Sequence, residues 1–397
     1  MSYAAPYKGL KVIDLSQGIA GPYCSMLLAQ HGADVIKVET LGEGDWARTL
    51  GSRYGDHTAF SIVGNLGKRS VTLDLKTDAG KAVLWRLIEA ADVFLEGFRP
   101  GVIGRLGFGW KAVHARAPRL LYLSISGFGQ TGPLSGRPAM DPVLQAYTGM
   151  VMENRAADGT PQRVPVIVAD MAAALYAFQA LSAGLYARRD EPLGRRYDIS
   201  LMQATAALQS VRLMQSHLEG GAVRPGVVPQ GVFRTRDGWI MLLALQNRDW
   251  VKLCEVLELP ELPADQRFVD AASRYANQDA LHDILRPRIA SFGSEWLAGR
   301  LADAQIMHER INDYAGYLAQ PHVQATHSIQ WLAQPGTASP VPVPTVPGIA
   351  PLHSGGPNAL SPVRGQHTDQ VLAEHGFTAA QIEALRADGV IASENER

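Results

Sequence analysis

The residue with the most direct chemical potential in this 397-residue chain is Asp170, in the stretch VPVIVADMAAALYAF at 164–178. An apolar run precedes it and an alanine-rich run follows, so the pattern predicts a strand, a helix cap and a helix. Aspartate is a preferred N-cap, which is one interpretation of the residue. A carboxylate at a helix start that faces a cleft can instead act as a nucleophile. The local pattern leaves both interpretations open.

Several other chemistries lack support in the sequence. The loop SQGIAGPY, which follows the first apolar run, lacks the G-x-G-x-x-G spacing of nicotinamide and flavin sites. The chain also lacks a P-loop, an H-E-x-x-H zinc motif, a C-x-x-C pair and a G-x-S-x-G elbow. Its eleven histidines are scattered. We therefore expect neither a metal site nor a tightly bound cofactor.

Composition and charge narrow the class of protein further. The chain has 37 Lys and Arg against 38 Asp and Glu. Its net charge is therefore close to zero and gives no strong electrostatic attraction to nucleic acid or to an anionic membrane surface. The two cysteines, Cys24 and Cys254, are far apart, which fits a reducing compartment better than a disulfide framework. The start, MSYAAPYKGLKVIDLS, lacks a basic region followed by an apolar core. We expect a cytoplasmic protein that acts away from nucleic acid and membranes.

The elements that must position Asp170 form an alternating pattern in the first half of the chain. Short apolar runs are separated by helical patterns, and these runs lie at 11–16, 34–39, 69–75, 92–98 and 120–129. This alternation predicts βαβ units in an α/β fold with a mostly parallel sheet. Ligands of such sheets bind at the carboxyl ends of the strands.

A smaller mixed domain is predicted after a segment rich in Gly and Pro, GGAVRPGVVPQG at 220–231. Beyond it, Asp237-Gly238 stands between two β-like runs, which indicates a hairpin. The proline-rich segment at 334–351 can form neither a helix nor a central strand, so we expect an extended connector or an edge.

Six segments, taken in order, resemble the family III CoA-transferases, also called the CaiB/BaiF family, which includes formyl-CoA transferase and carnitine CoA-transferase. They are GLKVIDLSQGIAGPYCSMLLAQHGADVIKVE, GKRSVTLDLKTDAGK, DVFLEGFRPGVIGRLGFGW, SISGFGQTGP, RPAMDPVLQAYTGM and GQHTDQVLAEHGF. The matches run nearly end to end.

The resemblance implies a large Rossmann-like domain built from both ends of the chain, a smaller α+β domain, and long linkers within an interlocked homodimer. On this basis we assign 1–213 and 345–397 to the large CoA-binding domain and 232–325 to the small domain. The linkers are 214–231 and 326–344.

The resemblance also places the catalytic residues. The family nucleophile is an Asp just before a small-residue helix, and the matching position is Asp170. The positive end of the helix would keep that carboxylate ionised. The family has an acidic residue at the position of Asp141, with an orienting or proton-handling role. From the residues alone, Asp141 before Pro142 is an N-cap pair. Gln145, one turn along, is similarly placed by the match.

For CoA binding, the resemblance implies a pocket near Leu73, Lys76, Phe98 and Arg105. Phe98 offers a face for stacking, and the two cations suit phosphates; their ordinary roles would be core packing and surface charge. Ala20 and Gly21 are small enough for close backbone approach to the ligand. Two positions depart from the family pattern, and they are Gln17 and Gly97. The family's glycine loop corresponds here only to RPGVVPQG.

The predicted function is transfer of CoA from an acyl-CoA thioester to a free carboxylic acid through a covalent aspartyl intermediate. One alternative is an acyl-CoA racemase or epimerase, but that branch resembles G-H-D where this chain has Ala139-Met140-Asp141. Methionine cannot exchange protons, which disfavours racemisation. The other alternative is a non-catalytic acyl-CoA-binding protein in which Asp170 is only a cap.

Overall fold

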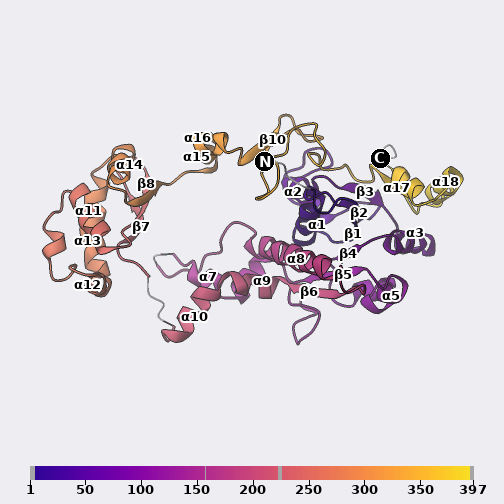
Figure 1. The fold of residues 1–397 in the computed structure, drawn as a ribbon, viewed down its shortest axis with the longest axis horizontal. Coiled ribbons are helices and arrows are strands. Elements are labelled where there is room, and N and C mark those ends of the chain that lie inside the picture. Colours follow the sequence, from indigo (N-terminus) through magenta and orange to yellow (C-terminus); the bar gives the residue numbers. More distant parts are fainter. Residues whose placement is uncertain (1–4, 157, 222–225, 394–397) are drawn as a thin grey trace. The chain divides into compact units, whose positions relative to one another are not determined.

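A computed structural model of the protein describes residues 5–156, 158–221 and 226–393. The chain divides into two compact units (Figure 1). The large unit comprises the residues up to 210 and those from 326 onward, and the small unit comprises residues 211–325.

The large unit is built on a six-stranded sheet in the order β3-β2-β1-β4-β5-β6, and all neighbouring strands are parallel. Its strands are β1 (Lys11–Asp14), β2 (Asp34–Glu39), β3 (Arg69–Thr72), β4 (Val93–Glu96), β5 (Leu121–Ser126) and β6 (Arg196–Ser200). The predicted α/β fold with a parallel sheet is therefore confirmed. The chain order reverses direction between β1 and β4, which makes the carboxyl ends of these two strands the topological switch point of the sheet.

Helices cover both faces of this sheet. Successive side chains of each strand point to opposite faces, so each strand contributes residues to two cores. Val12, Val35 and Leu95 lie in one core, and Ile13, Ile36 and Phe94 lie in the other. The helices of the first core are α1 (Ala20–Gln30), α6 (Asp141–Tyr147), α8 (Val168–Ala187) and α9 (Leu201–Leu208). Those of the second are α3 (Asp78–Glu89), α4 (Val102–Leu106), α5 (Trp110–Arg116), α17 (Thr368–Glu374) and α18 (Ala379–Ala387). Figure 1 shows the yellow C-terminal helices beside the indigo strands.

The end of the chain completes the large unit. Val371 packs in the same core as Val71, and the N–H of Asp74 donates to the carbonyl of Val390 at 2.8 Å. The proline-rich segment supplies β11 (Val341–Pro344), which pairs antiparallel with β10 (Ile329–Leu332). Short helices of the unit are η1 (Trp46–Thr49), α2 (Ala59–Asn65) and α7 (Met150–Glu153).

Helix α8 is long and apolar enough, by length and composition alone, to cross a membrane. Ala169, Ala173 and Ala177 are fully buried in the core under the sheet, as expected of a core helix. Small side chains on this face allow the backbone of α8 to approach α1 closely. Helix α8 is therefore packed firmly into the core, and this packing holds the residues of its first turn in place.

The small unit holds a three-stranded antiparallel sheet of β7 (Gln230–Arg234), β8 (Trp239–Leu243) and β9 (Met307–Arg310). The hairpin predicted around Asp237-Gly238 joins β7 to β8. The other elements from 210 to 325 are α10 (Ser210–Leu218), α11 (Asn247–Val256), η2 (Leu262–Ala264), α12 (Ala271–Ala276), α13 (Gln278–Ala290), α14 (Ser294–Asp303), α15 (Tyr314–Ala319) and α16 (Pro321–Ala325). The Gly- and Pro-rich boundary predicted at 220–231, and the RPGVVPQG stretch within it, fall partly on residues 222–225, which lie outside the described residues.

Candidate active site

Asp170 lines a cavity of about 330 Å³ in the large unit. Its other lining residues are Gln17, Ile19, Ala20, Gly21, Trp46, Gly97, Arg99, Ile125, Ser126, Gly127, Ala139, Met140 and Leu201. Most of them follow the carboxyl ends of β1, β4 and β5, where a parallel sheet binds its ligands. The nucleophile candidate therefore faces the topological switch point.

The interpretation of Asp170 as an N-cap is wrong. Helix α8 has Ile167 as its N-cap residue, and Asp170 is the third residue of the helix. Its carboxylate accepts no hydrogen bond from any other residue of the described ranges. The expected strand before it is also absent, since residues 164–167 carry no regular secondary structure. Asp170 is thus a helix residue with an unengaged carboxylate in a cavity.

Burial and, second, the charge of Asp141 raise the pKa of Asp170 to about 7. The expectation that the helix end would keep this carboxylate ionised is therefore wrong at acidic pH. A helix terminus is worth about 0.3–1 kcal/mol to an exposed anion, and here desolvation together with a second carboxylate outweighs it. Near neutral pH the protonated and ionised forms of Asp170 coexist.

Asp141 caps the helix that carries Asp170. It is the first residue of α6, with Met140 as the N-cap, and its side chain is buried. Its Oδ2 accepts the backbone N–H of Ala169 at 2.6 Å. That N–H is one of the four that a helix leaves without an internal partner. The predicted cap role of Asp141 therefore applies to α8 in place of its own helix.

Gln145 holds the chain that leads into α8. Its Nε2 donates to Asp141 Oδ1 at 2.7 Å and to the carbonyls of Val164 and Val166 at 3.2 Å each. Its Oε1 accepts the N–H of Val164 at 2.9 Å. One buried side chain thus satisfies the polar backbone of a segment whose β-branched composition predicted a strand. Gln145 and Asp141 together fix the start of α8, the helix that carries Asp170.

A buried ionic network fixes the loop after β1. Asp14 pairs with Lys68 at 2.8 Å and accepts the N–H of Ser16 at 2.9 Å, while Lys37 pairs with Asp45 at 2.8 Å and donates to the carbonyl of Ser16. Burial alone would raise the pKa of Asp14, but its lysine partners outweigh burial and hold that pKa below its ordinary value. Burial lowers the pKa of Lys68 to about 8. These contacts hold the segment that brings Gln17 and Ile19 to the cavity.

Sterics require glycine at two positions here, Gly18 in this loop and Gly21 in the first turn of α1. Gly18 has φ +82 and donates its N–H to Asp45 Oδ1 at 2.8 Å, and a Cβ on it would lie 2.3 Å from the ring of Trp46. A Cβ on Gly21 would lie 2.2 Å from Oγ of Ser16. Gly21 must therefore be small because of its contact with Ser16, and not only because a ligand approaches it. Gly21 and Ala20 nevertheless both line the cavity.

The remaining predicted CoA residues lie outside this cavity but along the same edge of the sheet. Leu73 follows β3 and is buried in the second core, and Phe98 packs against that core after β4. Lys76 and Arg105 are exposed. The structure thus shows packing for the two apolar residues and free surface for the two cations.

Arg99 is a cavity residue that the sequence reasoning missed. It lines the space that Asp170 faces, and its guanidinium forms no ion pair within the described parts of the chain. Its position directly after Phe98, in the stretch GFRPG that follows a predicted strand, was the available signal. Gln17 and Gly97, which depart from the family pattern, also line the cavity.

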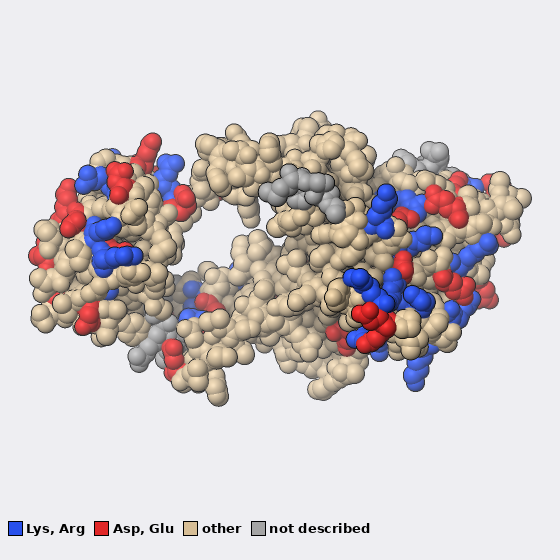
Figure 2. Space-filling view, viewed as in Figure 1, with Lys and Arg blue, Asp and Glu red and all other residues tan. Residues whose placement is uncertain are grey.

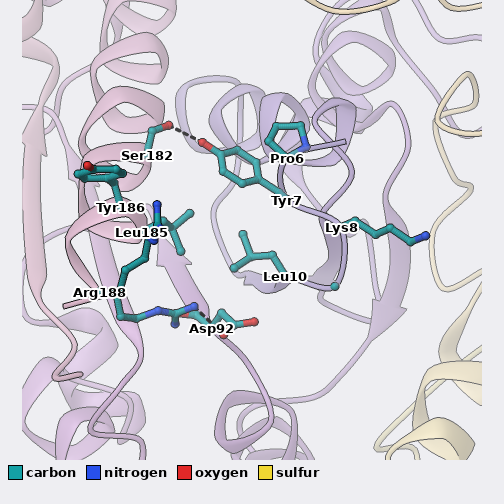
Figure 3. A pocket seen from close by; sticks show the side chains of 11 residues that line it. Pro6, Tyr7, Lys8, Leu10, Asp92, Ser182, Leu185, Tyr186 and Arg188 are labelled. Atoms are coloured by element: carbon teal, nitrogen blue, oxygen red, sulfur yellow. Dashed lines mark hydrogen bonds and ion pairs between the residues drawn. The ribbon is translucent and has the colours of Figure 1, made fainter. Parts of the chain in front are cut away.

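A larger cavity of about 590 Å³ lies where β1 and β4 begin (Figure 3). There Arg188 pairs with Asp92 at 2.9 Å, and Tyr7 donates to Ser182 at 2.8 Å. Four of its polar side chains, those of Tyr7, Asp92, Ser182 and Arg188, thus have partners within the protein, and the cavity lies at the amino edge of the sheet. Across residues 5–156, 158–221 and 226–393, no group of His, Cys, Asp and Glu could hold a metal ion.

Comparison with known proteins agrees with this geometry. Residues 7–368 match the family described as CoA-transferase family III. The chain is 36% identical over 300 residues to acetyl-CoA:oxalate CoA-transferase from Acetobacter aceti, covering 74% of this chain and 77% of that protein. It is 31% identical over 386 residues to succinyl-CoA:glutarate CoA-transferase from Homo sapiens, covering 94% and 87%. A crystal structure of a CAIB/BAIF family protein from Brucella suis is similar with a TM-score of 0.82 and 29% identity, covering 94% of this chain and 100% of that one.

Proposed function

We propose that Asp170 acts as a covalent nucleophile in this chain, which belongs to the CoA-transferase family III and transfers CoA between an acyl-CoA thioester and a carboxylic acid. The observation that carries the proposal is the unengaged carboxylate of Asp170, which lines a cavity at the switch point of the sheet. A carboxylate that only capped a helix would be hydrogen-bonded to backbone N–H groups.

The reaction conserves the thioester in four exchanges. Ionised Asp170 attacks the thioester carbonyl, forming a mixed anhydride and releasing the CoA thiolate. The thiolate attacks the aspartyl carbonyl, which gives an aspartyl-CoA thioester and the first free acid. The second acid attacks the aspartyl carbonyl of that thioester through its carboxylate, forming a new mixed anhydride and releasing the CoA thiolate. The thiolate then attacks the new acyl carbonyl, giving the product thioester and free Asp170.

Asp141 and Gln145 are proposed as positioning residues. Their side chains contact the backbone of Ala169, Val164 and Val166 and hold the first turn of α8. Precise placement of a nucleophile contributes several kcal/mol to a bimolecular reaction of this kind. The charge of Asp141, second to burial, also raises the pKa of Asp170. Asp141 would therefore set both the position and the acidity of Asp170.

CoA is proposed to bind along the carboxyl edge of the sheet. Arg99 would approach the reacting end, and Lys76 and Arg105 would approach the phosphates, with Phe98 and Leu73 as the apolar wall. Both exposed cations follow strands of the parallel sheet. Ala20 and Gly21 would let the thioester approach the loop after β1.

We propose a short dicarboxylic acid as one of the two acids exchanged. The cavity is small, and its one cationic side chain among the lining residues is Arg99. Two similar proteins are named for oxalate and for glutarate, which are both short dicarboxylates. A distal carboxylate paired with a guanidinium would orient the acid toward Asp170.

Trapping of the intermediate tests the mechanism. The protein is incubated separately with acetyl-CoA and succinyl-CoA, quenched with hydroxylamine or borohydride, and digested for peptide mass spectrometry. We expect modification at Asp170 with one of the donors and none at Asp141 or in an Asp170→Asn variant. An unmodified Asp170 with CoA still bound would leave only a binding protein.

A racemase would need a second proton-transferring group opposite Asp170. Met140 occupies the position at which the racemase branch resembles His, and it lines the same cavity as Asp170. Its thioether cannot carry a proton, so the geometry supports transfer over racemisation.

An interlocked homodimer is proposed for the assembled enzyme, with linkers at 214–231 and 326–344. On the face in Figure 2, the charged side chains of the large unit gather over α3, α5, α17 and α18, while the surface over α8 and α9 is almost free of them. Leu175 of α8 and Leu208 of α9 are 52% and 53% exposed. Such a surface fits a second chain. Light scattering after gel filtration tests the dimer.

The free, buried Cys24 and Cys254 support a cytoplasmic location.

A further inference from the structure

Glu96, the last residue of β4, is a buried acid to which the exchange reaction assigns no role. Its side chain is 1% exposed, and it forms no ion pair within the described ranges. Burial raises the pKa of its carboxyl above the ordinary value. An acid buried without a paired cation costs folding free energy, and exceptions of this kind are expected where a site needs them.

Two contacts hold the carboxyl group of Glu96. Its Oε2 accepts the backbone N–H of Phe98 at 2.9 Å. The hydroxyl of Ser124, which is in register with Glu96 on the neighbouring strand β5, donates a hydrogen bond to the same carboxyl group. One contact therefore anchors the side chain to the sheet, and the other holds the loop that leaves β4.

The loop after β4 contributes to both faces of the sheet. Gly97 and Arg99 line the cavity of about 330 Å³, whereas Phe98, between them, packs against the second core. The carbonyl of Arg99 accepts the N–H of Val102 at 3.1 Å, at the start of α4. The backbone of Arg99 is thus held on one side by Glu96, through Phe98, and on the other side by the first turn of α4.

Arg99 is the residue for which this placement matters. It is the one cationic side chain that lines the cavity, and we have proposed it as the partner of a distal carboxylate. Two parallel hydrogen bonds between a guanidinium and a carboxylate require a defined geometry. A long side chain on a loop can meet that requirement only if its backbone is fixed by residues behind it.

We propose that Glu96 is a positioning residue, which holds the loop after β4 so that Arg99 pairs with the distal carboxylate of the acid substrate. Glu96 itself does not touch the substrate. The group that the loop requires is an acceptor for the N–H of Phe98, so an amide can replace the carboxylate. This inference rests on the proposed function, in particular on the dicarboxylic acid and on the role of Arg99.

The experiment compares Glu96→Leu, Glu96→Gln and Arg99→Met with the wild type. Leucine lacks the acceptor, glutamine keeps an oxygen for the N–H of Phe98, and methionine removes the guanidinium. Gln334→Leu is the matched control. Gln334 is 5% exposed and its Oε1 accepts the backbone N–H of Ser361, also at 2.9 Å, but Gln334 does not line the cavity. Circular dichroism establishes that each variant is folded.

The measured quantity is the preference for a dicarboxylate over the monocarboxylate with the same number of carbon atoms, expressed as a ratio of kcat/KM values. Oxalate, succinate and glutarate are compared with acetate, butyrate and pentanoate. The donor is whichever of acetyl-CoA and succinyl-CoA labels Asp170 of the wild type, and the pair that contains the donor's own acid is left out. Both acids of a pair react with the same aspartyl-CoA thioester. Damage to the fold or to CoA binding therefore lowers both rates alike and leaves the ratio unchanged.

We expect Arg99→Met and Glu96→Leu each to lower the ratio by about tenfold or more, with the KM of the dicarboxylate raised, because a hydrogen-bonded charge pair is lost or misplaced. Glu96→Gln should stay within about threefold of the wild type, and Gln334→Leu should leave the ratio unchanged. Adding Glu96→Leu to Arg99→Met should lower the ratio no further, since both changes act on one contact.

A wild-type ratio in Glu96→Leu, together with a lowered ratio in Arg99→Met, would overturn the inference about Glu96 and leave the role of Arg99 standing. A further fall in the double variant would also overturn it, because Glu96 would then act by another route. So would an equal fall in Gln334→Leu. If the wild type shows no preference for dicarboxylates, or if Arg99→Met does not change that preference, the proposed substrate class or the role of Arg99 fails and the inference falls with it.

Discussion

Asp141 Oδ2 accepts the backbone N–H of Ala169 at 2.6 Å, one residue before Asp170. One acid therefore holds the turn on which the other stands. Burial and, second, the charge of Asp141 raise the pKa of Asp170 to about 7. The side chain of Asp141 therefore affects both the position and the acidity of Asp170, the proposed nucleophile. Variants of Asp141 that keep or remove the hydrogen bond can separate the two effects.

The pH dependence of the reaction should report the ionisation of Asp170. Only the carboxylate attacks, so kcat/KM should rise with pH and level off above the pKa of about 7. At pH 6 we expect a value about tenfold below the plateau. Asp141→Asn removes the neighbouring charge and should move the profile to lower pH. Steady-state rates from pH 5 to 9 check both statements; a flat profile across pH 6 to 8 would contradict them.

Asp141→Ala should lose the cap as well as the charge. Asn at this position still offers an oxygen to the N–H of Ala169, whereas Ala leaves that buried N–H without a partner. We expect Asp141→Ala to be less stable than Asp141→Asn by about 1–2 kcal/mol. Urea denaturation at pH 8 provides the comparison. Equal midpoints for the two variants would show that the 2.6 Å contact contributes nothing to stability.

Asp170→Asn should stabilise the protein at alkaline pH. The folded-state pKa of about 7 lies above the ordinary 3.8, so between these values the folded state binds more protons and stability falls as pH rises. Above pH 7 the ionised carboxylate remains as a cost of about 2–4 kcal/mol, which the amide removes. The gain in denaturation midpoint should therefore be larger at pH 8 than at pH 5. Asp190→Asn, at an exposed carboxylate just beyond the end of α8, serves as the control and should show no such trend.

Gly18→Ala should displace the loop that lines the cavity. The added Cβ would meet the ring of Trp46 at 2.3 Å, and φ +82 is itself unfavourable for alanine. Gly51→Ala isolates the second effect, because Gly51 has φ +83 and open space around it. We expect a loss of about 1 kcal/mol in Gly51→Ala, a larger loss in Gly18→Ala, and reduced kcat/KM only in the latter. Calorimetry and steady-state rates test this; equal losses would mean that Trp46 simply moves aside.

Lys37→Met should be among the most damaging single substitutions in the large unit. Burial alone would lower the pKa of Lys37, but the surrounding acids, Asp14 first, raise it above its ordinary value. Removing this cation leaves Asp45 buried without its 2.8 Å partner, which we expect to cost about 3–5 kcal/mol. Lys81→Met, which breaks a looser and partly exposed pair with Asp78, should cost less than about 1 kcal/mol. Adding Asp45→Asn to Lys37→Met should recover part of the loss.

The parallel sheet could be predicted from the sequence because each of its strands is a short apolar run between helical patterns. The segment before Asp170 could not, since Val164 and Val166 satisfy their backbone through Gln145, a side chain distant in sequence. Local propensity contains no term for such a partner. The same reason explains why the cap of α8 comes from Asp141.

The candidate site was predictable to the extent that family motifs carry it. Asp170, Ala20 and Gly21 line one cavity, whereas Leu73 is buried in the core on the other side of the sheet. Arg99 could be placed only once the strand ends had been brought together, because its residue type is common on any surface. The pKa of Asp170 likewise depends on burial that no sequence pattern reports.

The large unit is built from two separate segments of the chain, so its elements are synthesised at different times. Strands β1 to β5 leave the ribosome early, but α17 and α18, which cover one face of their sheet, leave last. The small unit is one continuous segment, so its core can form before the large unit is complete. A nascent chain stalled before Thr368 thus already holds Asp170 yet leaves Val71 and Phe94 without part of their cover. The final helices complete this core, so loss of a short C-terminal segment by premature termination would leave a chain that holds Asp170 but lacks a finished core.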